Sequence, residues 1–111
     1  MTDSILVLCT CGSEEEAGKI ARALVTNRLA ACVNILAPVR SIYRWKGAIE
    51  EATEWQLFIK TRRELLERIG NRIRLLHSYD TPEMLAIPVV DGLADYLHWI
   101  ASETGGQEDT E

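Results

Sequence analysis

The chain has 111 residues, of which 47% are hydrophobic and 26% charged, with a formal net charge of −5 at pH 7. This size and balance indicate one globular domain with a proper core, and the acidic excess argues against a nonspecific nucleic-acid binder. No basic leader precedes the first apolar segment, and no apolar run approaches the roughly 20 residues of a membrane span, so we expect a cytoplasmic protein.

The N-terminal segment predicts a strand followed by a helix. Residues 5–10 form a short apolar run, which is typical of a central strand covered on both faces. Ser13 and Glu16 have the spacing of a capping box at a helix start. The apolar positions of residues 17–25 recur on one helical face, so we expect a helix that ends near Asn27.

The next segment predicts a long β-hairpin. Residues 31–45 and 48–61 are two extended runs, and Gly47 supplies the turn between them. Pro38 interrupts the first run, which predicts a bulge or an edge position because proline cannot donate to the ladder. The start of the second run is polar, so the tip of the hairpin should project from the domain.

The C-terminal part predicts a helix, a strand and a second helix. Periodic apolar residues favour a helix over 63–77, and residues 84–90 form a fourth strand. A last helix should cover residues 92–102, with Asp91 as its N-cap. Residues 103–111 lack large apolar side chains and are predicted to be a disordered acidic tail.

The order βαββαβ with a terminal helix is the ferredoxin-like arrangement, an α+β fold with an antiparallel sheet, and we expect it as one domain over residues 1–102. Two helices cover one face of such a sheet. The first strand nevertheless carries apolar residues on both faces, Ile5 and Val7 on one, Leu6 and Leu8 on the other. Exposed apolar sheet is an association surface, so we predict a homo-oligomer.

Three cysteines are the first candidates for chemistry. An odd number argues against a disulfide framework, and a single close pair falls short of a structural zinc site. Cys9 and Cys11 lie two apart on a strand and should face the same way, and thiolates are soft ligands that suit Cu(I). The alternative is that both are small buried hydrophobes. Cys32 is expected to be structural.

Polar residues gather near the predicted ends of the third and fourth strands. Lys60 is expected to pair with Glu83, with Tyr79 beside them. This group is either a structural ion pair at a subunit interface or an anion- or metal-binding pocket between subunits. On the hairpin, Tyr43 and Trp45 share one side, a composition typical of interface cores. No hydrolase or nucleotide-binding motif occurs, so we expect no enzyme.

Five segments resemble the CutA family of divalent-cation tolerance proteins in their order and spacing: residues 29–34, 40–47, 59–62, 77–83 and 87–92. The resemblance implies a homotrimer that binds copper or another divalent cation without holding it constitutively. The positions that match the family's proposed copper ligands are Cys9 and His77. Leu76 stands where some relatives carry a second histidine, and Ser78 where proline is common. His77 could instead complement a helix C-terminus.

The resemblance also implies a ligand site in a cleft between subunits, lined by Tyr43, Trp45, Lys60, Tyr79 and Glu83. CutA architecture is similar to that of the trimeric PII signalling proteins, so the alternative function is a ligand-sensing or scaffold module. Because a shared fold does not determine function, both functions stay open at this point.

Overall fold

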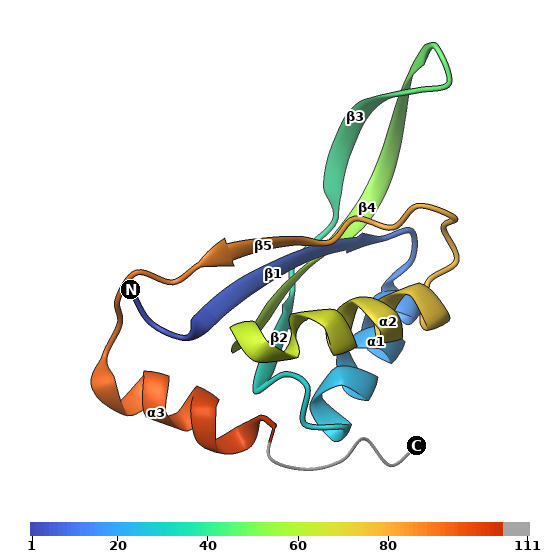
Figure 1. The fold of residues 1–111 in the computed structure, drawn as a ribbon. Helices are drawn as coiled ribbons and strands as arrows, with labels where there is room; N and C mark the ends of the chain where they lie inside the picture. Colours follow the sequence, from blue (N-terminus) through green and yellow to red (C-terminus); the bar gives the residue numbers. More distant parts are fainter. Residues whose placement is uncertain (106–111) are drawn as a thin grey trace.

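The strand order of the sheet confirms the predicted topology. The computed structural model describes residues 1–105. Its elements in chain order are β1 (Ser4–Cys11), α1 (Glu14–Thr26), β2 (Cys32–Ile35), β3 (Val39–Trp45), β4 (Ala48–Arg62), the 3-10 turn η1 (Arg63–Leu65), α2 (Leu66–Leu76), β5 (Leu85–Pro88) and α3 (Ala94–Glu103). The sheet runs β2-β4-β1-β5 with antiparallel neighbours, and β3 pairs with the outer half of β4. This is the ferredoxin-like α+β fold with a projecting hairpin and a C-terminal helix (Figure 1).

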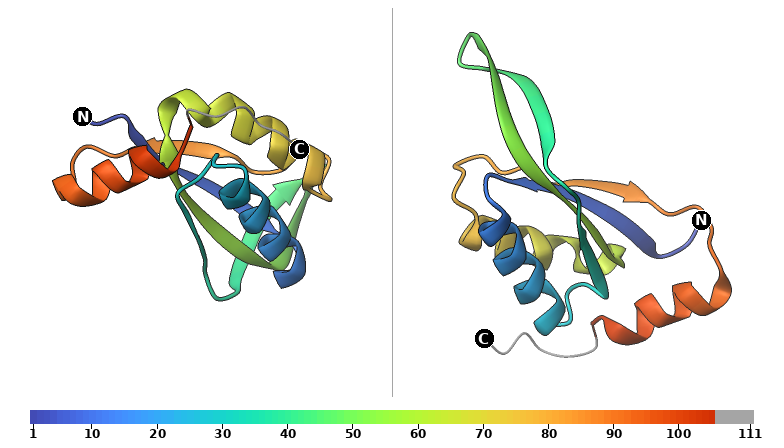
Figure 2. Two further views of the ribbon diagram at one scale, coloured as in Figure 1. Left: turned by 90° about the horizontal axis from the view of Figure 1, so that it is seen from below. Right: turned by 180° about the vertical axis from the view of Figure 1, so that it is seen from behind.

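The core lies between the sheet and the two helices α1 and α2, which cover the same face (Figure 2). Alternate residues of a strand point to one face, so every second residue of β1 and β4 enters this layer. The largest fully buried side chains come from β1, β4, both helices and the loop after α1, and include Val7, Leu57, Ile59, Ile20, Leu24, Leu29, Ile69 and Ile73. The same face buries Cys9 and Cys11, which places both thiols in the core.

The predicted strand over residues 31–45 is two strands joined by a bulge. Ile35 pairs with Leu57 in β4, whereas Val39 pairs with Glu54, so residues 36–38 face only two residues of the partner. The one extra residue lies within this stretch, which contains Pro38, as expected around a residue that cannot donate to a ladder. Because a bulge raises local twist, the hairpin formed by β3 and the outer half of β4 turns away from the main sheet (Figure 1).

The second face of the sheet carries an apolar patch without a covering helix layer. It is formed by Leu6, Leu8, Phe58, Leu85 and Ile87, which are neighbours in the strand register. Leu85 is 59% exposed and Ile87 44% exposed. Helix α3 reaches only the end of this face, where Tyr96 meets Lys60. Within residues 1–105, no helix combines the length and hydrophobicity that a membrane crossing requires.

The start of α3 differs from the prediction. The helix begins at Ala94, and the residue at its N-cap position is Leu93, whose side chain cannot cap it. Asp91 is not the N-cap, because its carboxylate accepts a hydrogen bond from the adjacent amide of Gly92 at 2.8 Å. Asp91 lies two residues before the N-cap position, and its side chain bonds the neighbouring backbone instead of the first turn of the helix.

The predicted boundary of the tail at residue 103 is also wrong. Helix α3 includes Glu103, and Thr104 is 3% exposed. The guanidinium of Arg62 donates to the hydroxyl and the carbonyl of Thr104, both at 2.9 Å. These bonds fix the chain after α3, and the amide of Gly105 donates to the backbone carbonyl of Arg28. Residues 106–111, the rest of the predicted tail, lie outside the described residues.

Candidate metal centre

The end of strand β1 carries the two thiols of the centre. Cys9 and Cys11 are two residues apart, so both point to the core face, and neither side chain is exposed to solvent. The pKa of the Cys9 thiol is raised above its ordinary value, first by a hydrogen bond with Cys11 and then by burial. The contact with Cys11 and burial thus both favour the thiol form of Cys9.

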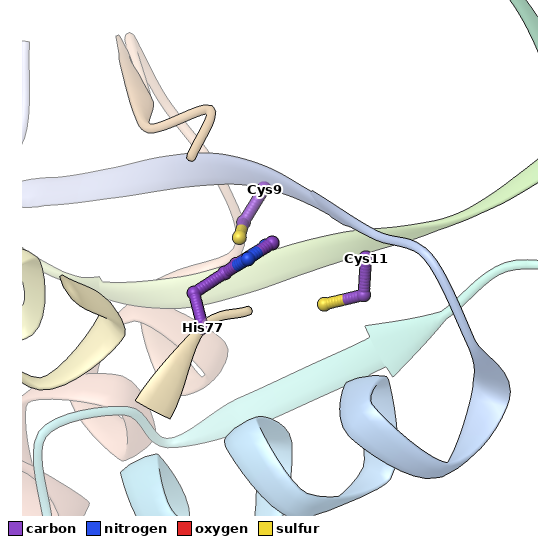
Figure 3. A group of neighbouring side chains, drawn as sticks. All are labelled: Cys9, Cys11 and His77. Atoms are coloured by element: carbon purple, nitrogen blue, oxygen red, sulfur yellow. The ribbon is translucent and has the colours of Figure 1, made fainter. Parts of the chain in front are cut away.

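His77 joins the two thiols from the loop that follows α2. Its imidazole lies between the side chains of Cys9 and Cys11 (Figure 3). The three candidate ligand atoms, one from each residue, lie within 4.8 Å of one another, and all three residues are buried. The structure thus brings together the two predicted ligands and Cys11, whose participation the sequence left open.

Both ring nitrogens of His77 already have hydrogen-bond partners. Nε2 donates to the carbonyl of Thr10 at 2.7 Å, and Nδ1 accepts from the amide of Tyr79 at 3.1 Å. These partners assign the ring proton to Nε2, since a carbonyl only accepts and an amide N–H only donates. The imidazole is therefore a structural bridge as well as a candidate ligand.

The carbonyl of Thr10 needs this bridge because strand β5 ends too early to pair with it. Backbone groups alternate sides along β1, and the carbonyl of Ser4 accepts from Val89 on the β5 side. Thr10 has the same parity, but the β5 pairing stops at Leu85 opposite Leu8. His77 supplies the missing donor. A buried carbonyl without a partner would destabilise the fold by about 1–3 kcal/mol.

Glu16 holds the loop that carries His77. Ser13 caps α1 by accepting from the amide of Glu16 at 3.1 Å, as the predicted capping box requires. The carboxylate of Glu16, however, reaches the loop after α2, where it accepts from the amide of Ser78 at 2.8 Å and from its hydroxyl at 3.2 Å. One oxygen of Glu16 is 3.9 Å from Nδ1 of His77. The sequence pattern predicted the helix start but not this tertiary contact.

A second polar group lies at the base of the hairpin. The hydroxyl of Tyr79 donates to the carboxylate of Glu54 at 2.8 Å, and Glu54 is only 8% exposed. Burial and this hydrogen bond raise the pKa of Tyr79. A side chain at Gly12 would meet the Tyr79 hydroxyl at 3.0 Å, so glycine allows the close approach. Sequence reasoning missed Glu54, which lies in a polar stretch of the chain that resembles an exposed strand.

The predicted pair of Lys60 and Glu83 does not form. The ammonium of Lys60 is 3.3 Å from the hydroxyl of Tyr96 and 5.6 Å from the centre of its ring. Glu83 accepts instead from the side chain of Gln56, at 3.4 Å. Lys60 and Gln56 are four residues apart on β4, a separation of about 13 Å, so the two charges are anchored too far apart.

The other predicted cleft residues are spread over the hairpin. Tyr43 lies opposite Glu50, and Trp45 lies beside the turn, where the ammonium of Lys46 is 5.8 Å from its ring. The pKa of Tyr43 is raised, chiefly by desolvation and then by Glu50. Tyr79 is near Tyr43, but Trp45 pairs with Ala48 at the start of β4, whereas Lys60 lies near the end of that strand. Within one chain these five residues do not form a single site.

Comparison with known proteins assigns the family. Residues 5–103 match the family described as "CutA1 divalent ion tolerance protein". The chain is 45% identical over 100 residues to "Divalent-cation tolerance protein CutA" of Thermus thermophilus, covering 90% of this chain and 97% of the relative. It is 43% identical to human "Protein CutA" over 91% of this chain, and it spans about half of that relative, 56% of its length.

Solved structures agree with this assignment. The divalent cation tolerance protein of Thermus thermophilus superposes with a TM-score of 0.90 at 44% identity, covering 92% of this chain and 99% of that one. The CutA structure from Xylella fastidiosa gives a TM-score of 0.91 at 42% identity, covering 94% and 100%. The chain belongs to the CutA1 family of divalent ion tolerance proteins.

Proposed function

We propose that this chain is a copper-binding protein that works as a homotrimer and contributes to the tolerance of divalent metals. One observation carries the proposal: the donor atoms of Cys9, Cys11 and His77 lie within 4.8 Å of one another in a buried part of the fold. Sulfur and imidazole nitrogen bind copper in preference to the hard cations magnesium and calcium. The name of the Thermus relative, a divalent-cation tolerance protein, agrees with the proposal that this chain binds a metal ion.

Cys9 and His77 are the proposed ligands, and the fold supports both roles. Cys9 is held in the centre of the sheet, where β1 pairs with Leu57 of β4. His77 is held by its loop, which the carboxylate of Glu16 ties to helix α1. Both side chains are sequestered from water. Copper bound here would be kept away from solvent and from dissolved oxidants, which is the chemistry that metal tolerance requires.

The apolar patch on the second face of the sheet supports the homotrimer. Leu85 and Ile87 are large apolar side chains that remain about half exposed in a single chain, next to the half-buried Leu6 and Leu8. Burying such area releases about 25 cal/mol per Å², so association of this face with other copies is favourable. The hairpin of β3 and β4 projects far enough to contact a neighbouring copy (Figure 1).

The alternative function, a PII-like module that senses a ligand, has less support. Lys60 and Glu83, which would contact such a ligand, have separate partners within the chain, Tyr96 and Gln56. A common site could arise only between chains. If the chain were a sensor, Lys60→Ala would abolish its response to the ligand and leave copper binding unchanged.

We also propose that the protein is located in the cytoplasm and that it has no enzymatic activity. Cell fractionation checks the proposed location.

The test is an anaerobic copper titration of the purified oligomer against a competing chelator. We expect Cys9→Ser and His77→Ala each to weaken binding by tenfold or more, about 1.4 kcal/mol. Cys32→Ser and His98→Ala are the matched controls, because Cys32 lies on β2 and exposed His98 lies on α3. Binding that neither test variant weakens would contradict the proposal and make the two thiols and the imidazole core groups only.

A further inference from the structure

The candidate centre contains two thiols at equal depth, and we propose that Cys11 is the second thiolate of a site that binds monovalent copper between Cys9 and Cys11. This inference rests on the proposed copper binding and specifies two further properties, the oxidation state of the ion and the rank of its ligands. His77 is then a third and weaker ligand.

The positions of the sulfur atoms suit one ion between them. Cys9 and Cys11 project from the same face of β1, and the His77 ring lies between their side chains in the view of Figure 3. The ligand atoms lie within 4.8 Å of each other. A metal–sulfur bond is about 2.3 Å long, so two such bonds in line span about 4.6 Å. The pair can therefore bind an ion with little movement of the strand.

His77 ranks behind the thiols because it must first give up a hydrogen bond. Coordination by Nδ1 would displace the amide of Tyr79, and coordination by Nε2 would displace the carbonyl of Thr10. Either loss leaves a backbone group without its partner, which offsets part of the energy of the new bond. Coordination by the thiols leaves no well-bonded backbone group without its partner, because the bond from Cys9 to the carbonyl of Thr10 is long, at 3.8 Å.

The donor set selects a soft monovalent ion over Cu(II). Cu(II) favours a tetragonal arrangement of nitrogen and oxygen ligands, and this cluster offers a single imidazole. The nearest carboxylate, that of Glu16, is already used by the amide and hydroxyl of Ser78. Two sulfur ligands and one optional nitrogen match the low coordination number that Cu(I) accepts.

The binding step moves protons and no electrons. Cu(I) enters, the S–H bonds of Cys9 and Cys11 break, two Cu–S bonds form, and both protons leave to water. A cation must displace both protons to bind here, which favours a strongly thiophilic ion. Helix α1 is capped by Ser13, two residues after Cys11, and a helix N-terminus favours the negative charge of the bis-thiolate complex.

The experiment titrates the full-length oligomer anaerobically with Cu(I), and separately with redox-inert Ag(I), against a competing chelator, and follows the thiolate-to-metal absorption band. We expect Cys11→Ser to weaken binding of both ions at least as much as Cys9→Ser does, and His77→Ala to weaken it less than either. Cys32→Ser should bind like the unmodified chain. X-ray absorption of the unmodified Cu(I) complex should give two sulfur neighbours, a readout that does not depend on how any variant folds.

Each outcome separates this inference from the proposed function. Loss of binding in Cys9→Ser and His77→Ala with none in Cys11→Ser, or a single sulfur neighbour, would overturn the two-thiolate site and leave copper binding intact. Tighter binding of Cu(II), titrated against the same competing chelator, than of Cu(I) would overturn the selectivity. If none of the variants changes the affinity, the proposed function fails together with the inference.

Discussion

At the scale of single residues, His77 shows how one side chain can serve the fold and a site together. The imidazole closes the sheet edge at Thr10, where β5 has ended, and it lies between two thiols. Removing it therefore leaves a buried carbonyl unpaired as well as removing a ligand. For this reason, the His77→Ala result must be compared with the stability of the variant, and His77→Gln, which can still donate to Thr10, separates the two effects.

Glu16 is predicted to stabilise the same loop from the other side. Its carboxylate accepts two hydrogen bonds from Ser78, and a hydrogen bond to a charged group contributes about 1.5–3 kcal/mol. We therefore expect Glu16→Ala to lower the free energy of unfolding by about 2 kcal/mol, measured by guanidinium denaturation at a fixed chain concentration.

Glu15→Ala is the matched control for Glu16→Ala. Both residues lie in the first turn of α1, where the helix dipole favours a negative charge, but Glu15 is exposed. Its removal should forfeit only the dipole effect, about 0.3–1 kcal/mol. Equal losses in the two variants would mean that the contact with Ser78 contributes nothing to stability.

The centre could be predicted from the sequence only in part, and the reason lies at this scale. Cys9 and Cys11 are two apart on a strand, so their common face follows from alternation. The approach of His77 depends on where β5 ends and on how Glu16 holds the loop, and both are tertiary contacts between distant segments. Likewise, the expected pair of Lys60 and Glu83 failed because it depended on the register of β4, which local pattern does not reveal.

At the scale of elements, the residues near the ends of helices and strands predicted the boundaries correctly where no alternative hydrogen bond competed. Ser13 caps α1 as its pattern indicated, and Pro38 marks the bulge between β2 and β3. At α3 the same type of reasoning failed. Asp91 bonds its neighbouring amide instead, so the helix begins at Ala94 without a polar cap. A short polar side chain near a helix start has more than one backbone partner in reach, and the sequence does not rank them.

The uncapped start of α3 makes Leu93 a position for stabilisation. Leu93 has extended backbone angles, and its carbonyl already accepts from Leu97, so it occupies the N-cap position. An aspartate there can accept from the orphan amides of the first turn and complement the helix dipole. We expect Leu93→Asp to raise the free energy of unfolding by about 1 kcal/mol in thermal or chemical denaturation.

Leu93→Ala separates capping from the loss of the apolar side chain. Leu93 is 81% exposed, so in the chain alone its removal should change stability little. If Leu93→Asp and Leu93→Ala are destabilised alike, the leucine contributes through a contact with another subunit, and the missing cap is not what limits the stability of α3.

At the scale of the whole molecule, helices cover one face of the sheet, and the other face stays exposed in a single chain. The helices α1 and α2 cover the face that carries Cys9 and Cys11, whereas the opposite face presents Leu85 and Ile87 to solvent. Apolar residues on both faces of β1 predicted this outcome from the sequence. The partner of the exposed face could not be derived from the residues, and the homotrimer comes from the family resemblance.

Ile87→Lys tests whether this face holds the proposed trimer together. Ile87 is 44% exposed in the chain, so a lysine can lie along the surface with its charge in water and leave the single chain folded. In an interface between copies, the same ammonium would be desolvated without a partner, once per chain, which is strongly unfavourable. We expect the unmodified protein to sediment at three times the 12.5 kDa chain mass at micromolar concentration, and Ile87→Lys to sediment as a smaller species.

Val25→Lys is the control that gives this comparison its meaning. Val25 lies on α1, on the opposite side of the sheet, and is 43% exposed, almost the same as Ile87. A lysine at Val25 adds the same charge and removes a side chain of similar exposure, so it should leave the sedimentation coefficient unchanged. A trimer that survives Ile87→Lys would mean that the copies associate through another surface, and the projecting hairpin would then be the next element to alter. A monomer in the unmodified protein would contradict the trimer itself, and the apolar patch of β1 and β5 would then need a different partner to cover it.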